Sequence, residues 1–261
     1  MNDETRKVFC YMTKRKKIFI TGATSGVGLL LAKNLHAAEH EIWASGRNVE
    51  VLEHLDELGL HTIQADLAEE QSFEDLFQMM ETPDTLVLCA GVGTFAYLSE
   101  LEEKDMTQMM HVNVIAPMIL TKYFAEKMKE RGSGHIIFVA SQAGKVATPK
   151  ASVYAASKHA ILGFANSVRM ELKAYGIQVT TINPGPIDTP FLDLADLTGN
   201  YRDKLSKHLL SPEKVVEAII KTIEHPVREV DLPSYMSLTS KLYAIFPKTV
   251  ETLGKSFFNK K

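Results

Sequence analysis

The sequence predicts an α/β protein built on one parallel sheet that is covered by helices on both faces. Short, almost continuously apolar segments alternate along the chain with longer segments of helical character. Parallel strands that are buried on both faces are typically such apolar runs, and the helices between them supply the crossover connections. A glycine-rich turn after the first strand is a third sign of a doubly wound sheet.

The elements follow one another in regular order. Strands are expected at residues 17–21, 41–45, 60–65, 85–89, 135–140, 177–183 and 230–232, and each is a mainly apolar run. Helices are expected at 27–36, 49–58, 71–80, 104–130 and 152–175, in the longer segments between the strands. Because no linker or low-complexity segment interrupts this series, we expect a single Rossmann-type domain.

Residues suited to ligand binding stand directly after the expected strands. Ligands of such sheets bind beyond the carboxyl ends of the strands, where the winding reverses. In strand order, these positions hold Gly22, Gly26 and Gly28, then Arg47, Asp66, Ala90 and Gly91, Ser141, and Pro184 and Gly185. One cofactor-sized ligand that crosses all these strand ends explains the pattern.

The chain divides into a central domain and two flanking segments. We expect an N-terminal extension at residues 1–16, a catalytic domain at 17–232 with a substrate lid at about 189–211, and an amphipathic tail at 233–261. Met12 is an alternative start, because residues 1–11 add nothing that this fold requires.

Composition excludes several classes of protein. A net charge of −3 gives no electrostatic footprint for nucleic acid. The two cysteines, Cys10 and Cys89, form no Cys-x-x-Cys motif, and the nine histidines are scattered, so we expect neither disulfides nor a metal site. No apolar run reaches the roughly 20 residues of a membrane span, and the basic segment 14–17 lacks the apolar stretch of a signal peptide. A cytoplasmic location is expected.

Tyr154 and Lys158 are the strongest candidates for chemistry. Residues four apart share one helix face, so the phenol and the ammonium point to the same place. A nearby cation favours phenolate, so we expect the pKa of Tyr154 to lie below its ordinary value of about 10. The pair then exchanges a proton with an alcohol or carbonyl. By itself this spacing is equally typical of an exposed helix face.

The glycine turn and the second strand indicate a dinucleotide. Three glycines within residues 21–28 let the backbone approach a pyrophosphate at a helix N-terminus, although they also suit a plain tight turn. The second strand ends without an acid and is followed by Arg47, whose guanidinium matches a ribose 2′-phosphate. NADP is therefore favoured and NAD is the alternative, since Ser25 stands where many NADP binders carry a basic residue. Asp66 suits either an adenine contact or a helix cap.

Together, these motifs resemble the short-chain dehydrogenase/reductase family over residues 17–232. The glycine motif at 21–28, Asp66-Leu67, Ala90-Gly91, Asn113, Ser141, the Tyr154/Lys158 pair and Pro184-Gly185 all stand in the family's order. The resemblance implies that Tyr154 is the general acid or base, that Ser141 holds the substrate oxygen, and that Lys158 holds the nicotinamide ribose. It also implies that Asn113 binds a water of a proton relay, and a role as a polar residue that caps a local backbone irregularity is compatible with this.

The resemblance further implies an extended cofactor site. Its residues are Gly22, Thr24, Ser25, Gly26, Val27, Gly28, Arg47, Asp66, Leu67, Ala90, Gly91, Asn113, Tyr154, Lys158, Pro184, Gly185, Ile187 and Thr189. One position departs from the family, because Cys89 stands where an asparagine usually ties neighbouring strands together. This departure puts part of the sheet's stabilisation in doubt, and a buried packing cysteine is favoured over a reactive thiol.

The substrate is expected to be a neutral, apolar carbonyl compound or alcohol. The lid contains Phe191, Leu192, Leu194, Leu197, Leu209 and Leu210, and residues 142, 143, 146 and 147 are expected to face the pocket with few charges. The tail mixes apolar residues with lysines, which suits packing on the domain or on a subunit more than contact with a membrane surface. A homodimer or homotetramer is expected from the resemblance.

The leading hypothesis is an NADPH-dependent carbonyl reductase. Two alternatives are a non-catalytic dinucleotide sensor or scaffold on the same fold, and a membrane-associated lipid-keto reductase. The sensor is less consistent with a chain that retains Ser141, Tyr154, Lys158 and Asn113 together.

Overall fold

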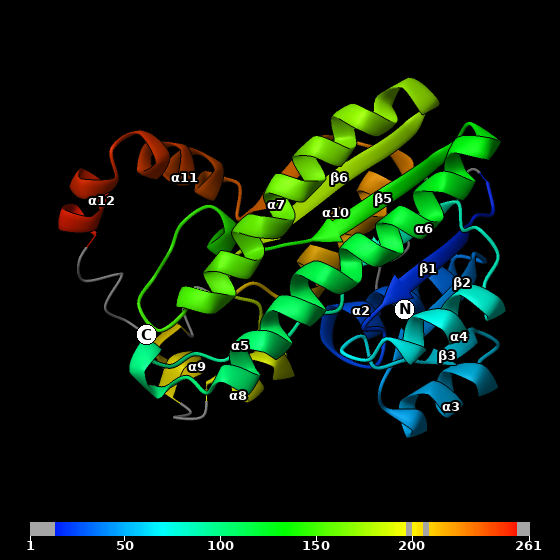
Figure 1. Cartoon of the computed structure of the whole chain (residues 1–261), viewed down its shortest axis with the longest axis horizontal. Coiled ribbons are helices and arrows are strands. Elements are labelled where there is room, and N and C mark those ends of the chain that lie inside the picture. The colour runs from blue at the N-terminus through cyan, green and yellow to red at the C-terminus, as the bar shows by residue number, and fades with distance from the viewer. Residues whose placement is uncertain (1–13, 197–199, 206–208, 255–261) are drawn as a thin grey trace.

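A computed structural model of the chain describes residues 14–196, 200–205 and 209–254 (Figure 1). Within these residues, seven strands form one sheet in the order β3-β2-β1-β4-β5-β6-β7, and every neighbouring pair is parallel. The strands are β1 (Lys17–Thr21), β2 (Glu41–Gly46), β3 (His61–Gln64), β4 (Thr85–Leu88), β5 (Gly134–Val139), β6 (Ile177–Pro184) and β7 (Glu229–Leu232). The predicted doubly wound sheet is confirmed, and its winding reverses between β1 and β4.

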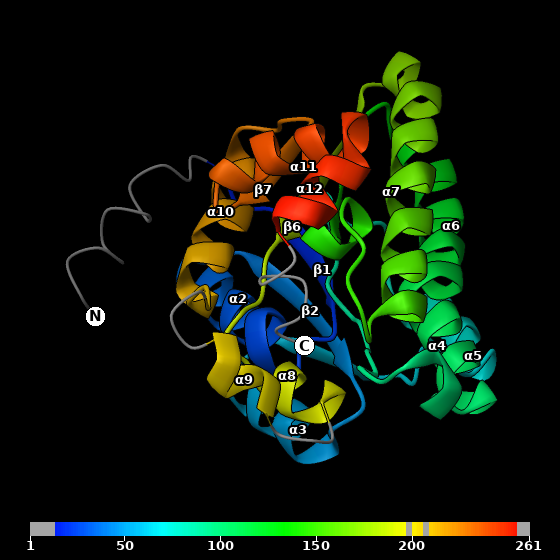
Figure 2. The same cartoon turned by 90° about the vertical axis from the view of Figure 1, so that its left-hand side faces the viewer.

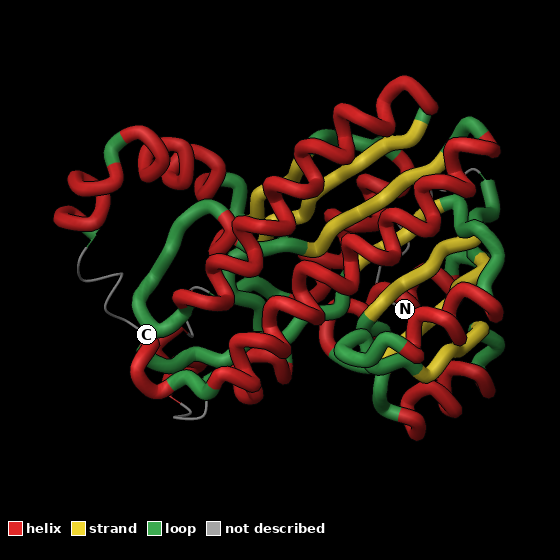
Figure 3. The backbone as a smooth tube through the Cα atoms, viewed as in Figure 1, coloured by secondary structure: helices red, strands yellow, loops and turns green. Residues whose placement is uncertain are grey.

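Helices cover both faces of this sheet, so the strands run between two helical layers (Figure 3). The longer helices are α2 (Gly26–Ala37), α3 (Val49–Glu57), α4 (Gln71–Met79), α5 (Glu103–Met110), α6 (Ala116–Arg131), α7 (Ser152–Leu172) and α10 (Pro212–Glu224). The short helices α8 (Pro190–Ala195) and α9 (Asn200–Leu205) occupy the expected lid. The tail forms α11 (Tyr235–Ile245) and α12 (Pro247–Leu253).

Each face of the sheet buries its own apolar cluster. One cluster packs the sheet against α4, α6 and α7, and the other packs it against α2, α3 and α10. Phe19 of β1 meets Phe124 of α6 edge to face at 5.8 Å, and both rings are fully buried. Burial of such side chains supplies about 1.5–3 kcal/mol each, which holds the strand ends in fixed register. A third cluster, around Tyr154, lies beyond the carboxyl ends of the strands.

The predicted helix at 104–130 is not continuous. A π-helical turn, η2 (His111–Ile115), separates α5 from α6, and the amide of Ala116 donates to the carbonyl of His111, five residues earlier. Pro117 explains the wider turn, because a proline lacks the N–H for its residue i−4, here Asn113, and its ring crowds that carbonyl. The prediction missed this proline, although it stands inside the expected helix.

Smaller differences concern the ends of elements and one whole helix. The predicted helix at 152–175 ends at Leu172 and continues as a 3₁₀ turn, η4 (Lys173–Tyr175). Helix α10 was not predicted, although Pro212 follows Ser211 and apolar residues recur with helical spacing behind it. Prolines are favoured in the first turn of helices, so the signal was present.

The N-terminal extension is tied down where the structure describes it. The ammonium of Lys16 donates to the carbonyl of Ile223 at 2.7 Å and lies 3.3 Å from Glu224. Cys10 and Met12, Leu197 of the lid and residues 255–261 lie outside the described residues. No helix in the described part of the chain is both long and apolar enough to cross a bilayer.

Candidate active site

A cavity of about 820 Å³ runs along the carboxyl ends of the strands. All the predicted catalytic and cofactor residues except Asn113 lie on its wall. Its length, from Arg47 beyond β2 to Tyr154 on α7, suits a dinucleotide with a substrate at its far end. The fold therefore brings together residues that are scattered along the chain from Gly22 to Thr189, because parallel strands all end at one edge.

The glycine turn is held by the packing of the chain against itself. Gly22 has a φ of +69°, and a side chain there would meet the Cα of Ala90 at 2.7 Å. A side chain at Gly28 would clash with the carbonyl oxygen of Gly22. The plain tight-turn interpretation therefore accounts for both glycines, and the turn leaves the first amides of α2 on the cavity wall. No acidic residue stands in the first turn of α2, so this helix start suits an anion such as a pyrophosphate.

Arg47 and Asp66 face each other at the same end of the cavity. Nη1 of Arg47 lies 3.8 Å from Oδ2 of Asp66, and the arginine side chain is 58% exposed. Oδ1 of Asp66 accepts a hydrogen bond from the amide of Ala68 at 3.0 Å. Asp66 thus closes a turn after β3 and does not cap a helix, because the N-cap position of α4 is Glu70. It lines the cavity, and its contact with an adenine stays a prediction.

The sheet compensates for the cysteine at position 89. The hydroxyl oxygen of Thr21, at the end of β1, accepts hydrogen bonds from the amides of Cys89 and Ala90, both at 3.1 Å. This side chain joins β1 to β4, which answers the doubt about the sheet's stabilisation. Burial raises the pKa of the Cys89 thiol to about 11, so the thiol stays protonated at neutral pH, as expected of a packing residue.

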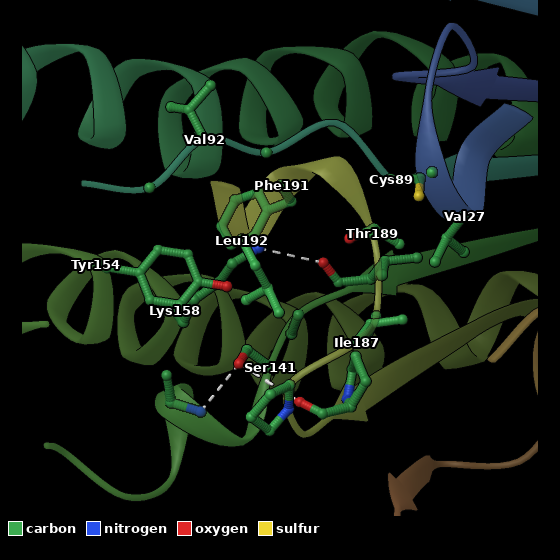
Figure 4. A pocket seen from close by; sticks show the side chains of 18 of the residues that line it. Val27, Cys89, Val92, Ser141, Tyr154, Lys158, Ile187, Thr189, Phe191 and Leu192 are labelled. Atoms are coloured by element: carbon green, nitrogen blue, oxygen red, sulfur yellow. Dashed lines mark hydrogen bonds between the residues drawn. The ribbon is translucent and has the colours of Figure 1, made fainter. Parts of the chain in front are cut away.

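Tyr154, Lys158 and Ser141 converge in the cavity (Figure 4). The ammonium of Lys158 lies 5.7 Å from the centroid of the Tyr154 ring and donates to the carbonyl of Val139 at 3.3 Å. Ser141 follows β5, and its hydroxyl accepts a hydrogen bond from the amide of Ala143 at 3.0 Å. One helix and one strand end therefore supply a phenol, a cation and a hydroxyl to the same space.

The prediction of a lowered Tyr154 pKa is wrong for this arrangement. Burial raises the pKa of Tyr154 to about 12, and a hydrogen bond with Ser141 offsets only part of that rise. Burial also lowers the pKa of Lys158 to about 8. Desolvation is the largest contribution to both pKa shifts, because both side chains are almost completely buried. At neutral pH the phenol is therefore a protonated donor next to a cation that gives up its proton easily.

Asn113 lies behind the cavity rather than on its wall. Its side chain accepts from the amide of Val92 at 2.9 Å and donates to the carbonyl of Val92 at 2.8 Å. It also donates to the hydroxyl of Ser157 at 3.0 Å. These bonds tie the π-helical turn to the loop after β4 and to α7, which fits the interpretation of Asn113 as a residue that satisfies an irregular backbone.

A buried polar network supports the turn that carries Ser141. Oδ1 of Asp231 on β7 accepts hydrogen bonds from Gln142 at 2.8 Å, Asn183 at 3.1 Å and Lys145 at 2.6 Å. Burial alone would raise the pKa of Asp231, but hydrogen bonds led by that of Lys145 hold the pKa below its ordinary value. The network joins the ends of β5, β6 and β7, and sequence reasoning missed it.

The other end of the cavity is apolar. Phe95 and Phe191 surround the Tyr154 ring at centroid distances of 5.6 and 5.8 Å, and Met109 and Leu205 extend the wall. The lid residues Leu192 and Leu194 line the cavity, as do Gln142, Ala143 and Val146. Leu209, Leu210 and Ala147 are not part of the wall, and Leu210 instead pairs with Ile187 in a short bridge.

The tail contributes the remaining wall of the cavity. The residues are Tyr235, Met236, Thr239, Tyr243, Val250 and Gly254, from α11, α12 and the end of α12. Sequence analysis expected the tail to pack on the domain but did not place it over the site. Phe95 also escaped notice, because it stands in an irregular loop without periodicity. Among the described residues, no group of three or more His, Cys, Asp or Glu side chains could hold a metal ion.

Comparisons with known proteins agree with this geometry. A family model described as short chain dehydrogenase matches residues 16–197. The oxidoreductase YxnA of Bacillus subtilis (strain 168) is 35% identical over 260 residues, which cover 92% of this chain and 71% of that protein. A serine dehydrogenase structure in complex with NADP⁺ aligns with a TM-score of 0.76 and 27% identity, over 82% of this chain and 93% of that one. A 4-hydroxyisoleucine dehydrogenase structure in complex with NADH has a TM-score of 0.73 and 26% identity, over 82% and 95%.

Proposed function

Because this chain belongs to the short-chain dehydrogenase/reductase family, and is an oxidoreductase of the kind that uses NAD(P), we propose that it reduces an apolar ketone or aldehyde with NADPH. The observation that carries the proposal is the position of the Tyr154 phenol, which shares one cavity with Ser141, Lys158 and an apolar chamber. Metal-free carbonyl reduction needs a proton donor at the oxygen and a hydride source at the carbon, and this site suits both.

The proposed reaction assigns each proton to a residue. A nicotinamide cofactor, when bound, supplies the hydride that reduces the carbonyl carbon. Tyr154 donates its phenolic proton to the carbonyl oxygen, and the hydroxyl of Ser141 holds that oxygen as charge develops on it. Lys158 then stabilises the phenolate and returns a proton to it, which suits an ammonium whose pKa is lowered to about 8 by burial. Asn113 positions α7 and the loop after β4, and a relay water on this residue remains part of the proposal.

The proposal of NADP rests on Arg47. Its guanidinium lines the cavity just beyond β2, and β2 ends in Gly46 without an acid that would repel a phosphate. The ion pair with Asp66 is long, at 3.8 Å, and half-exposed, so a 2′-phosphate would compete for the guanidinium at little cost. The two solved relatives carry different cofactors, NADP⁺ in one and NADH in the other.

The proposal of an apolar substrate rests on the lining of the chamber. Around Tyr154 the wall consists mainly of Phe95, Met109, Phe191, Leu192 and Leu205, and Lys158 is the only ionisable cation among the described residues there. A carboxylate substrate would lose its hydration in this chamber without a dedicated cation. A neutral, lipophilic carbonyl compound gains about 25 cal/mol per Å² of apolar surface that it buries.

The Tyr154→Phe variant tests the chemistry. We expect it to bind NADPH as the wild type does and to lose turnover by at least about 100-fold, because general acid catalysis typically contributes that much. Cofactor binding is followed by fluorescence titration and turnover by the loss of NADPH absorbance with a panel of lipophilic ketones and aldehydes. Tyr175→Phe, an exposed tyrosine on η4, is the matched control. Retained turnover in Tyr154→Phe would remove the assigned role, and cofactor binding without turnover in the wild type would favour the sensor.

The Arg47→Ala variant tests the cofactor. We expect NADPH to bind about 10- to 100-fold more weakly, in line with the loss of a charged hydrogen bond of about 1.5–3 kcal/mol. The affinity for NADH, which lacks the 2′-phosphate, should stay unchanged and serves as the internal control. Equal losses for the two cofactors would contradict a phosphate-specific role for Arg47.

Assembly into a homodimer or homotetramer also belongs to the proposal. In the family that this chain resembles, the helices that carry Asn113 and Tyr154 form the usual interface, and here these segments are η2 with α6, and α7. Sedimentation velocity of the full chain measures the state, and a monomer at micromolar concentration would contradict the expectation.

A further inference from the structure

The two helices of the tail, α11 and α12, have two apolar faces. We call residues 235–254 the C-terminal arm. One face of α11 lines the cavity through residues that are three or four positions apart: Met236, Thr239 and Tyr243. The opposite face presents a second stripe with the same spacing, which is exposed: Leu238, Leu242 and Ile245. A helix that only packed on its own domain would carry polar residues on that outer face.

The exposed apolar surface continues beyond α11. Phe246 at the turn between the helices is 57% exposed, and Leu253 on α12 is 82% exposed. Leu194 of the lid, which lines the cavity, is itself 76% exposed, and so the rim of the cavity is apolar too. The arm and the lid helices lie at the same end of the molecule, which faces the viewer in Figure 2. Such a concentration of large apolar side chains on a protein surface marks an interaction site.

The tail carries a charge opposite to that of the rest of the chain. Residues 233–261 contain five lysines and one glutamate, a net charge of +4, whereas the whole chain carries −3. Within the described residues, the lysines Lys241 and Lys248 are exposed on the arm, beside the apolar stripe. Lysines that flank an apolar helix face are typical of segments that lie on anionic lipid surfaces.

We propose that the C-terminal arm binds the surface of an anionic phospholipid bilayer. Leu238, Leu242, Ile245 and Phe246 enter the boundary between headgroups and acyl chains, and Lys241 and Lys248 contact the anionic headgroups. A second copy of this chain is a poorer occupant, because a two-fold interface through the arm would bring together two tails (residues 233–261), each with a net charge of +4. One further step rests on the proposed function. If the substrate is a lipophilic carbonyl compound, it passes from the bilayer along the apolar rim at Leu194 to Tyr154.

The test measures how the full chain partitions onto vesicles in a sedimentation assay. Vesicles of phosphatidylcholine alone are compared with vesicles that contain 30% phosphatidylglycerol, about the share that gives a strongly negative surface. We expect the protein to bind the anionic vesicles and to bind them more weakly as salt is added, because salt screens the attraction between the lysines and the anionic headgroups. At about fivefold per lysine, the double variant Lys241→Gln, Lys248→Gln should bind about 25-fold more weakly.

Apolar variants separate insertion from simple charge attraction. The triple variant Leu238→Ser, Ile245→Ser, Phe246→Ser should lose binding even at low salt, whereas Met170→Ser should bind as the wild type does. Met170 is a matched control, since it is 71% exposed and lies on α7, away from the arm. A cofactor titration of each variant shows that the fold is intact, and it needs neither substrate nor vesicles. Failure of the proposed function would therefore leave the vesicle result unchanged.

Three outcomes would overturn the proposal. The wild type stays in the supernatant with every vesicle composition. The triple variant binds anionic vesicles as tightly as the wild type. The wild type does not bind vesicles, and the triple variant changes the sedimentation coefficient of the free protein. In that case a second copy of the chain covers the arm.

Discussion

Replacement of Lys158 by methionine should change how the stability of the protein depends on pH. The side chain of Lys158 is 5% exposed, and burial lowers its pKa from 10.5 to about 8. Between pH 8 and 10.5 the unfolded chain therefore holds a proton that the folded chain has released. Stability rises with pH wherever the unfolded state binds more protons, so the free energy of unfolding of the wild type rises between pH 8 and 10.5. Below pH 8 both states hold the proton, and the wild type bears the full cost of burying the ammonium.

The magnitude follows from the two pKa values. At 1.36 kcal/mol per pKa unit, the difference between 10.5 and about 8 corresponds to about 3 kcal/mol. The variant also loses the hydrogen bond from Lys158 to the carbonyl of Val139 at 3.3 Å, which contributes about 1 kcal/mol. We therefore expect Lys158→Met to be more stable than the wild type by about 2 kcal/mol at pH 7 and about equally stable at pH 10.

Urea unfolding of both proteins without cofactor, at pH 7 and pH 10, measures this difference. Other titrating groups, including Tyr154, are common to both proteins and largely cancel in the comparison. Lys173→Met replaces an exposed lysine and is the control, with an expected change of less than about 0.5 kcal/mol at either pH. If the stability difference between Lys158→Met and the wild type stays constant from pH 7 to pH 10, burial does not destabilise the charged form of Lys158, and the prediction is refuted.

Three further changes test the packing around the site. Thr21→Val keeps the shape of the side chain but leaves the amide of Cys89 without its acceptor. The free energy of unfolding at pH 7 should fall by about 1–3 kcal/mol, and an unchanged midpoint in urea would contradict the link between β1 and β4. Asp231→Asn should cost about 3 kcal/mol by removing the charge that faces Lys145. Because the pKa of Asp231 is lowered below its ordinary value of 3.8, this loss should fade as the pH falls below that value and through the lowered pKa; a loss that is independent of pH would contradict the pairing. Leu120→Ala leaves a cavity between α6 and the sheet, with an expected loss of about 2–5 kcal/mol in thermal or urea unfolding; less than 1 kcal/mol would mean that this face repacks freely.

The sequence was sufficient for the sheet and for the chemical groups. Strands and helices have periods of two and 3.6 residues, so apolar spacing within one segment shows the type of the segment. Parallel strands that end at one edge then place Gly22, Arg47, Ser141 and Gly185 on one cavity, as predicted. The spacing of Tyr154 and Lys158 is likewise local, since it depends only on the pitch of α7.

The tertiary structure decided the electrostatics of the site and much of its wall. The pKa of Tyr154 lies above rather than below its ordinary value, because its burial depends on Phe95 in the loop after β4 and on Phe191 in α8. The hydrogen bond between Gln142 and Asp231 spans 89 positions of the chain, and that between Thr21 and Cys89 spans 68. No local pattern encodes such pairs.

The tail shows the same division most clearly. Its sequence predicted one amphipathic tail with several lysines, and only the fold decided that the tail divides into two helices and that one face of α11 lines the cavity while the other stays exposed. Helical periodicity reports which residues share a face, but which face meets the protein depends on where β7 ends in the sheet. The physical reason is that side-chain spacing is set within one helix turn, whereas burial is set by segments that meet only after the chain has folded.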